Sequence, residues 1–169
     1  MSRDPELLDL AALIAQGSEL EIDCELKSLT RLAPLLSDSA GTAHGKFRFH
    51  RVAGAPAAEG RVTATLPVTC QRCMGDLAIA VDTECRLVFA DADAANAEAS
   101  IEEELVTTHG GRISLAELVE EELLLAMPLV AVHGEGSGCS TQAAAGVQAA
   151  GEPKQRPFAG LRDLLKDGK

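Results

Sequence analysis

Apolar and polar residues alternate along four segments of the chain, and this period of two predicts β-strands with one buried face. The strands are expected near residues 20–27, 45–52, 61–69 and 77–89. In the second strand, Phe47 and Phe49 share one side while basic residues occupy the other, so we expect both rings in the core. Cys24 and Cys85 fall on the apolar sides of their strands and are expected to be small buried hydrophobes.

Two short helices are expected near the ends of the chain. Asp4 precedes a proline and an acidic residue, which is typical of a helix N-terminus, and Gly17 ends the apolar run that follows at helical spacing. At the other end, residues 157–169 form an amphipathic segment that we expect to be a helical tail docked on the core.

A longer helix is expected over residues 114–127. Ser114 and Glu117 form a capping box, in which each side chain satisfies the amide of the other residue, and Pro128 ends the run. Leucines and valines recur along one side of this segment, which predicts a deeply buried stripe. Its solvated face is expected to carry Glu117, Glu120 and Glu121.

These elements predict an α+β fold, with an antiparallel β-sheet covered by the 114–127 helix. The length of 169 residues suits a single domain, which we expect over residues 1–135. Within it, residues 61–89 are expected to form a long hairpin. Residues 136–156 are rich in Ala, Gln and Gly and are expected to form a flexible low-complexity loop before the 157–169 tail.

A Cys-x-x-Cys-x-Gly sequence lies at the expected tip of this hairpin. Cys70 and Cys73 have the spacing of a metal-binding knuckle, and Gly75 can take the positive φ that such a turn needs. The backbone amides of the turn can also stabilise the sulfurs as thiolates. A thioredoxin-like dithiol lies where a strand meets a helix, whereas both flanks here alternate as strands, so dithiol redox catalysis is disfavoured.

A structural zinc site needs four ligands, and the hairpin supplies two of them. His133 and Cys139 follow the 114–127 helix in a glycine-rich segment that could fold back around an ion. The candidate zinc ligands are therefore Cys70, Cys73, His133 and Cys139. The loose spacing leaves an alternative open, in which His133 and Cys139 are incidental loop residues and the knuckle is an empty turn.

Charge and aromatic content bear on the kind of partner. The net charge is −11 and four Phe are the only aromatic residues, which argues against a uniformly basic or base-stacking nucleic-acid clamp. Residues 44–86 nevertheless hold six basic residues against four acidic ones, while residues 87–135 hold eleven acidic residues and one basic residue. These runs are either solvated faces or a basic face for RNA beside an acidic face for a basic protein. The candidate RNA contacts are Lys46, Arg48, Arg51, Arg61 and Arg72.

The expected location is the cytoplasm. The five cysteines are an odd number and no long apolar segment lies near the start, which favours a reducing compartment. The longest apolar stretch, residues 123–132, is interrupted by a proline and is too short to span a bilayer, so no membrane partner is expected. No spacing of His, Cys or acidic residues singles out a catalytic group, and an enzyme is not expected.

Several segments form a set that occurs together in one known family. They are Pro67-Val68-Thr69-Cys70-Gln71-Arg72-Cys73, Arg86-Leu87-Val88-Phe89, the run from Ser114 to Val130, and Pro157-Phe158-Ala159-Gly160-Leu161. The combination of CQRC with a Glu-rich leucine helix that ends in a proline resembles the YceD family. The resemblance covers about the whole chain from the hairpin onward.

The resemblance implies a non-enzymatic cytoplasmic protein needed for accumulation of large-subunit (23S) ribosomal RNA. Members of the family often carry further cysteines after the helix, which complete a zinc-ribbon-like set with the CQRC pair. This chain offers His133 and Cys139 there, without a second Cys-x-x-Cys.

Two modes of action stay open. In the first, the protein binds pre-ribosomal RNA or particles through the outward basic residues around the hairpin. In the second, it is an acidic assembly chaperone or adaptor for a basic large-subunit ribosomal protein, and it uses the acidic residues of 98–122 and the C-terminal tail.

Overall fold

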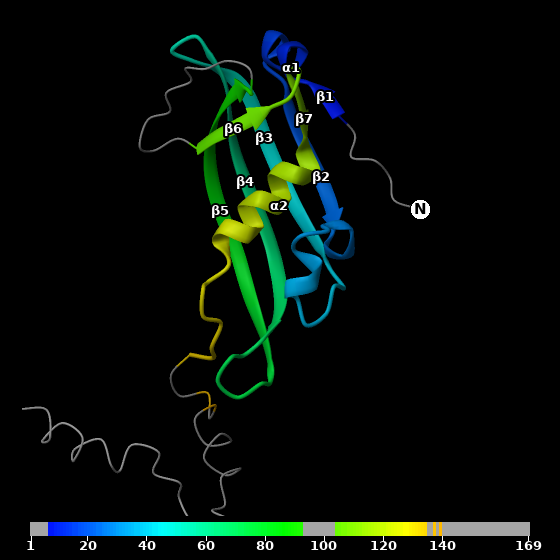
Figure 1. Ribbon diagram of the computed structural model, residues 1–169, viewed down its shortest axis with the longest axis vertical. Coiled ribbons are helices and arrows are strands. Elements are labelled where there is room, and N and C mark those ends of the chain that lie inside the picture. Colours follow the sequence, from blue (N-terminus) through cyan, green and yellow to red (C-terminus); the bar gives the residue numbers. More distant parts are fainter. Residues whose placement is uncertain (1–6, 93–103, 135–136, 138, 140–169) are drawn as a thin grey trace, which may run out of the picture.

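The structure is a computed structural model that describes residues 7–92, 104–134, 137 and 139 (Figure 1). The elements in chain order are β1 (Leu7–Asp9), α1 (Leu10–Gln16), β2 (Glu19–Glu25), the 3-10 turns η1 (Leu26–Ser28) and η2 (Ala33–Leu35), β3 (Thr42–Val52), β4 (Ala55–Thr69), β5 (Asp76–Asp91), β6 (Glu104–Thr108), β7 (Arg112–Ser114) and α2 (Leu115–Ala126).

Five strands form the main sheet, in the order β2-β3-β4-β5-β6. The first four pair antiparallel, and β3 turns into β4 at Ala53 and Gly54, both of which have positive φ. β6 lies parallel to β5, with Glu104 opposite Leu87, so the sheet is mixed. The prediction of an antiparallel sheet with helices is therefore confirmed only in its coarse form, since four strands pair antiparallel but the edge strand β6 is parallel.

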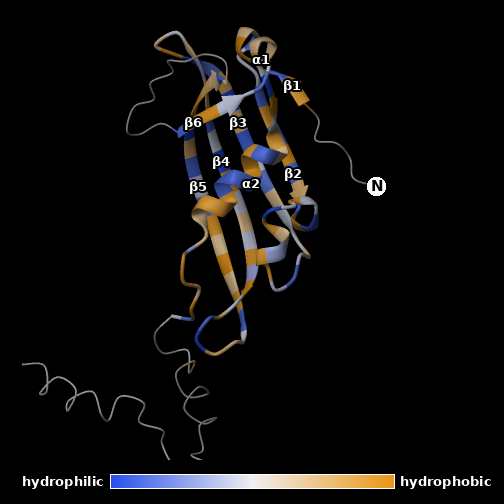
Figure 2. Cartoon of the chain, in the orientation of Figure 1, coloured by the Kyte–Doolittle hydropathy of each residue, from blue (hydrophilic) through white to orange (hydrophobic). Residues whose placement is uncertain are grey.

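One face of the sheet carries the core. α2 packs across β2, β3, β4 and β5 on this face (Figure 1). Phe47 and Phe49 have no exposed surface, and the ring of Phe49 stacks on Phe89 with 6.2 Å between centroids. Cys24 and Cys85 are also buried. The predicted core positions of these residues are confirmed, and Figure 2 shows the alternation of apolar and polar residues along the strands.

Two glycines let the core close tightly. A Cβ atom at Gly60, which lies opposite Phe47, would come within 2.5 Å of that ring, and one at Gly45 would lie 2.5 Å from a methyl carbon of Val119 on α2. Real Cβ atoms do not approach other atoms so closely. The two positions therefore accept only glycine if the Phe47 ring and α2 are to keep their distance from the sheet.

The N-terminal helix begins later than predicted. α1 starts after Asp9, whose carboxylate accepts a hydrogen bond from the amide of Ala12 at 3.1 Å, while Asp4 lies outside the described residues. Leu7–Asp9 instead form β1, because they pair antiparallel with β7, a partner more than a hundred residues away. The end of the helix is as predicted: Gly17 takes a φ of +58°.

α2 matches the sequence pattern except at one glutamate. The Ser114 hydroxyl accepts a hydrogen bond from the amide of Glu117, as predicted, and Glu117 and Glu121 are exposed. The expected exposure of Glu120 is wrong, since it is only 5% exposed. One of its oxygens accepts hydrogen bonds from the amides of Arg31 and Leu32, and the other accepts one from the Arg31 guanidinium. These hydrogen bonds of Glu120 hold the 26–36 loop against α2.

The expected 136–156 loop lies outside the described residues except for Ser137 and Cys139, and the 157–169 tail lies wholly outside them. The division into one domain, a loop and a tail therefore stays a prediction. Among the helices that the structure describes, none is both long and apolar enough to cross a membrane.

Candidate metal centre

The β4–β5 connection is a tight turn that holds Cys70 and Cys73. The amide of Cys70 donates to the carbonyl of Gly75 at 2.8 Å, and the amide of Met74 donates to the carbonyl of Cys70 at 2.9 Å. Met74 takes the left-handed conformation, with a φ of +59°, rather than Gly75 as expected. Its side chain is 75% exposed, so solvent accommodates it at this backbone position.

The chain that follows α2 returns to this turn. The amide of Gln71 donates to the carbonyl of Ala131 at 2.8 Å. Two residues later, the Nε2 atom of His133 lies 2.9 Å from the carbonyl oxygen of Asp76, the first residue of β5. These two contacts bring the 131–134 segment against both sides of the turn.

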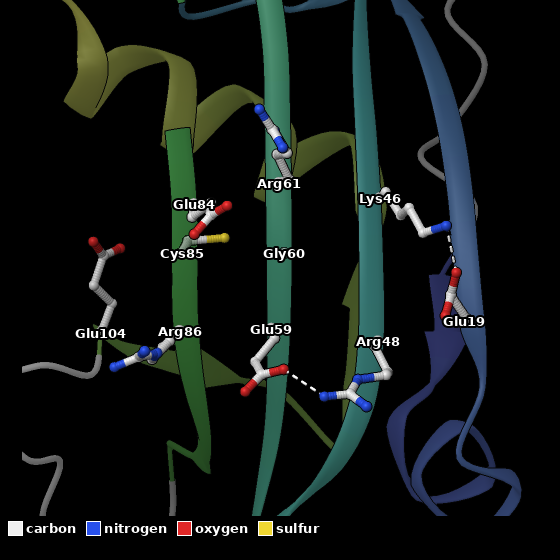
Figure 3. Close-up of a pocket in the computed structure, with 10 residues that line it drawn as sticks. All are labelled: Glu19, Lys46, Arg48, Glu59, Gly60, Arg61, Glu84, Cys85, Arg86 and Glu104. Atoms are coloured by element: carbon white, nitrogen blue, oxygen red, sulfur yellow. Dashed lines mark hydrogen bonds and ion pairs between the residues drawn. The ribbon is translucent and has the colours of Figure 1, made fainter. Parts of the chain in front are cut away.

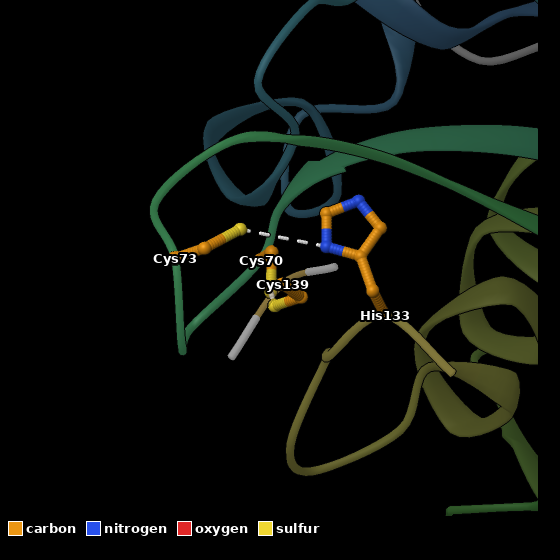
Figure 4. A group of neighbouring side chains, drawn as sticks. All are labelled: Cys70, Cys73, His133 and Cys139. Atoms are coloured by element: carbon orange, nitrogen blue, oxygen red, sulfur yellow. Dashed lines mark hydrogen bonds between the residues drawn. The ribbon is translucent and has the colours of Figure 1, made fainter. Parts of the chain in front are cut away.

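The return places all four predicted zinc ligands in one cluster (Figure 4). Their ligand atoms, three sulfurs and one imidazole nitrogen, lie within 4.8 Å of one another. The Cys70 and Cys139 sulfurs are 3.6 Å apart, and the Cys73 sulfur is 3.5 Å from Nδ1 of His133. Cys70 and Cys139 are buried, while Cys73 and His133 are half-buried.

Two of the distances within the cluster match those around a bound zinc ion. Usual zinc–ligand bonds of about 2.3 Å to sulfur and about 2.0 Å to nitrogen imply tetrahedral edges of about 3.8 Å between sulfurs and about 3.5 Å between sulfur and nitrogen. The measured 3.6 and 3.5 Å agree with both edges. The four side chains therefore could bind a metal ion, and their donor set suits zinc.

The surroundings of the thiols favour the metal-binding form. Burial raises the pKa of Cys70, but the backbone amides of Cys73 and Arg72 more than offset it and lower this pKa to about 5. Burial likewise raises the pKa of Cys139, but hydrogen bonds from Arg72, Cys73 and His133 together outweigh burial and lower this pKa too. For Cys73, the Gly75 amide lowers the pKa, yet the neighbouring thiols and burial raise it overall. The lowered pKa values make the Cys70 and Cys139 thiols easier to deprotonate, and so readier to bind a metal, than ordinary cysteines.

The imidazole of His133 is held in the orientation that a ligand needs. A carbonyl oxygen only accepts hydrogen bonds, so Nε2 must carry the proton that faces Asp76. In the neutral ring Nδ1 then carries no proton, so its lone pair is free to bind a metal, and it points at Cys73. The thiols of Cys139 and Cys70 raise the pKa of His133, so a bound metal would have to displace a proton from Nδ1 at low pH.

The predicted RNA contacts lie in three places. Arg72 lies at the cluster, where its Nε atom donates to the Cys139 sulfur at 3.2 Å. Lys46, Arg48 and Arg61 lie on the sheet face opposite α2, and Arg51 donates to the carbonyl of Gly54 at the β3–β4 turn.

Three bases of the open sheet face form ion pairs with acids, and Figure 3 shows the pairs of Lys46 with Glu19 and of Arg48 with Glu59. Lys46 forms ion pairs with Glu19 and Glu21, Arg48 contacts Glu59 at 2.6 Å, and Arg61 contacts Asp82 at 2.7 Å. Lys46, Arg48 and Arg61 line a groove of about 630 Å³ over Gly60. Its charged lining residues are Lys46, Arg48, Arg61, Arg86, Glu19, Glu59, Glu84 and Glu104. Four bases thus face four acids, and the formal charges of the described lining residues balance.

The sequence pattern left the exposure of one ionisable group on α2 open. Glu122 on α2 is 4% exposed, and burial, with the Glu104 carboxylate next, raises its pKa to about 7. Burial and Glu122 together raise the pKa of Cys85 to about 12, so this thiol stays protonated and inert. Glu122 lies a turn after Leu118 and Val119, and that spacing was the available signal for its burial.

The fold and the cluster define a class of protein: a sheet scaffold with α-helices on one face and a Cys₃His candidate metal centre at one end of its longest strand pair. A family model described as "Large ribosomal RNA subunit accumulation protein YceD" matches residues 58–165, which is 108 of the 169 residues. The chain therefore belongs to the YceD family, as the resemblance indicates. Searches of curated proteins and of solved structures returned no match.

The matched region includes all four candidate ligands, while Lys46, Arg48 and Arg51 precede it. The description of the family names a role in the accumulation of large-subunit ribosomal RNA.

Proposed function

We propose that this protein is a non-enzymatic, cytoplasmic ribosome biogenesis factor that supports the synthesis, processing or stability of large-subunit ribosomal RNA. The observation that carries the proposal is the family match over residues 58–165. Its working part is a rigid sheet whose hairpin end is fixed by zinc.

The zinc has a structural role in this proposal. Cys70, Cys73, His133 and Cys139 supply all four positions of a tetrahedral ion, whereas catalytic zinc keeps one position for water or substrate. A saturated donor set supports stabilisation of the fold rather than hydrolysis. When bound, the ion would hold His133 and Cys139 to the hairpin. Backbone contacts of Gln71 and the imidazole contact of His133 already align the 131–134 segment with this turn.

The charge distribution favours the adaptor mode over direct RNA binding. The groove on the open sheet face has balanced charges, and Lys46, Arg48 and Arg61 each have an acidic neighbour there. A phosphate backbone would have to displace these carboxylates against a net charge of −11. A basic large-subunit ribosomal protein meets no such cost, because the overall charge attracts it.

Depletion of the protein in its own cells tests the proposed function. We expect the ratio of large- to small-subunit ribosomal RNA to fall, and wild-type protein to restore it. Cys70→Ser/Cys73→Ser should fail to restore the ratio, while Cys24→Ala, which alters a buried cysteine outside the cluster, should restore it. An unchanged ratio after depletion contradicts the role in ribosomal RNA accumulation.

Binding measurements separate the two modes. The adaptor mode predicts salt-sensitive affinity for a purified basic large-subunit ribosomal protein, and this affinity should survive Lys46→Gln/Arg48→Gln/Arg61→Gln. Direct RNA binding predicts affinity for a large-subunit RNA transcript that falls with the logarithm of salt concentration. In that mode the triple variant should weaken binding and flatten the salt dependence.

A further inference from the structure

We infer that Arg72 is a positioning residue of the metal centre, which holds the Cys139 ligand in place and offsets the charge of the thiolates. The sequence alone makes Arg72 a candidate RNA contact. The inference rests on the zinc centre proposed above, and it deepens that proposal by assigning a role to a residue between the two knuckle cysteines.

The geometry places the Arg72 guanidinium across the junction of the two ligand segments. Its Nε atom donates to the Cys139 sulfur at 3.2 Å, and its Nη2 atom donates to the carbonyl of His133 at 2.8 Å. Arg72 itself belongs to the turn that carries Cys70 and Cys73. One side chain of the hairpin therefore contacts both ligand residues of the returning segment.

The charge of a loaded centre explains why a cation is needed at this point. Three thiolates and a neutral imidazole around a divalent ion leave a net charge of −1, and the guanidinium brings the sum to zero. Cys70 and Cys139 are 0% and 7% exposed, so water screens this charge poorly. Arg72 itself is exposed, but its contact with the Cys139 sulfur is partly buried, so the hydrogen-bonded cation stabilises the thiolate more than it would at an open surface.

The chemistry of arginine suits both contacts. The guanidinium presents several N–H donors in one rigid plane, so it reaches a sulfur and a carbonyl at the same time, whereas a lysine ammonium is a single point charge. The exposed arginines of the open sheet face behave differently. Arg48 and Arg61 contact carboxylates there, and Arg61 precedes Cys70 by nine residues along extended β4. They provide matched controls for the loss of one positive charge.

Zinc affinity measured by competition with a chromophoric chelator tests the inference. Loss of a residue that orients a metal ligand typically weakens affinity about 10- to 100-fold, and we expect this for Arg72→Gln. Arg72→Lys should bind zinc more tightly than Arg72→Gln but more weakly than the wild type, because lysine keeps the positive charge and lacks the planar set of N–H donors. Arg61→Gln should bind as the wild type does.

A cobalt spectrum adds a measurement that a general loss of stability would not move. The hydrogen bond from Arg72 stabilises the lone pairs of the Cys139 sulfur, so its removal should shift the thiolate-to-cobalt charge-transfer band to longer wavelength. Arg61→Gln should leave the band in place. If Arg72→Gln unfolds, Arg72→Lys alone decides, since its band should shift in the same direction.

The outcomes separate the two proposals. If the wild-type protein binds neither zinc nor cobalt, the metal centre itself is wrong. If the wild type binds and the Arg72 variants match it in affinity and spectrum, the centre stands and the role of Arg72 is overturned.

Discussion

The Nδ1 atom of His133 lies 3.5 Å from the sulfur of Cys73, although 60 residues separate the two along the chain. The contact joins the segment after α2 to the turn between β4 and β5. His133 and Cys139, near the end of the described chain, are therefore held against the β4–β5 turn through their side chains. A metal ion at this point would turn an alignment of weak contacts into a fixed junction.

Removal of the metal should loosen this junction without opening the sheet. We expect the amide of Gln71, which donates to Ala131, to exchange its hydrogen at least about tenfold faster in the presence of a chelator. The amide of Phe49, which donates to the carbonyl of Ser18 at the other end of the fold, is the internal control. Hydrogen exchange resolved by residue checks both, and equal protection of Gln71 with and without chelator contradicts the role of the metal.

The buried carboxylate of Glu120 should be essential to the 26–36 loop. Glu120→Ala leaves the amides of Arg31 and Leu32 without their acceptor, and we expect it to lower the free energy of unfolding by about 2–4 kcal/mol. Glu121→Ala removes only an exposed ion pair with Arg31 and should cost less than about 1 kcal/mol. Urea unfolding compares the two, and equal effects would show that burial of Glu120 is not the cause.

Glu122 should make stability depend on pH near neutrality. Its folded pKa is raised to about 7 from 4.5, first by burial and then by the Glu104 carboxylate. Between these values the folded protein keeps a proton that the unfolded chain has lost. The free energy of unfolding therefore falls by about 3 kcal/mol as pH rises through this window, and it levels off at higher pH.

Glu122→Gln keeps a neutral side chain at every pH and should flatten this dependence. The variant should be more stable than the wild type at pH 8 and similar to it near pH 5. Urea unfolding at several pH values checks the slope, with Glu117→Gln at the exposed start of α2 as the control. If the free energy of unfolding of Glu122→Gln still falls with pH as in the wild type, another group is responsible for the pH dependence.

Gly60 should be intolerant of any side chain. In Gly60→Ala the new methyl group would lie 2.5 Å from the Phe47 ring and 2.8 Å from the Cys85 sulfur, so the core must shift. We expect a loss of about 1–3 kcal/mol in the free energy of unfolding. Gly134→Ala, where no atom lies within 4 Å of the new carbon, should change stability by less than about 0.5 kcal/mol. Equal midpoints for the two variants in thermal unfolding would contradict the close packing.

Features that depend on local pattern could be predicted from the sequence. The alternation around Phe47 and Phe49 placed both rings in the core, because the side on which a strand residue lies follows from its position alone. The capping of α2 by Ser114 is likewise a contact within one turn. The clustering of the four candidate ligands could be predicted because few residue types bind zinc, and two of the four have a fixed spacing.

Features that depend on distant partners could not be predicted. β1 exists because Leu7–Asp9 pair with β7, and Glu120 is buried because a loop nearly ninety residues earlier presents two amides to it. The acceptor for His133 is the backbone carbonyl of Asp76, which no side-chain pattern reveals. In the same way, nothing near Arg72 in the sequence indicates that it contacts the Cys139 sulfur.

The metal content of protein purified without a metal-binding tag tests the central claim most directly. Elemental analysis should find about one zinc per chain in the wild type and in Cys24→Ala, and none in Cys70→Ser/Cys73→Ser. Wild-type protein that folds and carries no zinc, or a double variant that keeps its zinc, would contradict the account of the Cys70, Cys73, His133 and Cys139 cluster as a structural metal centre.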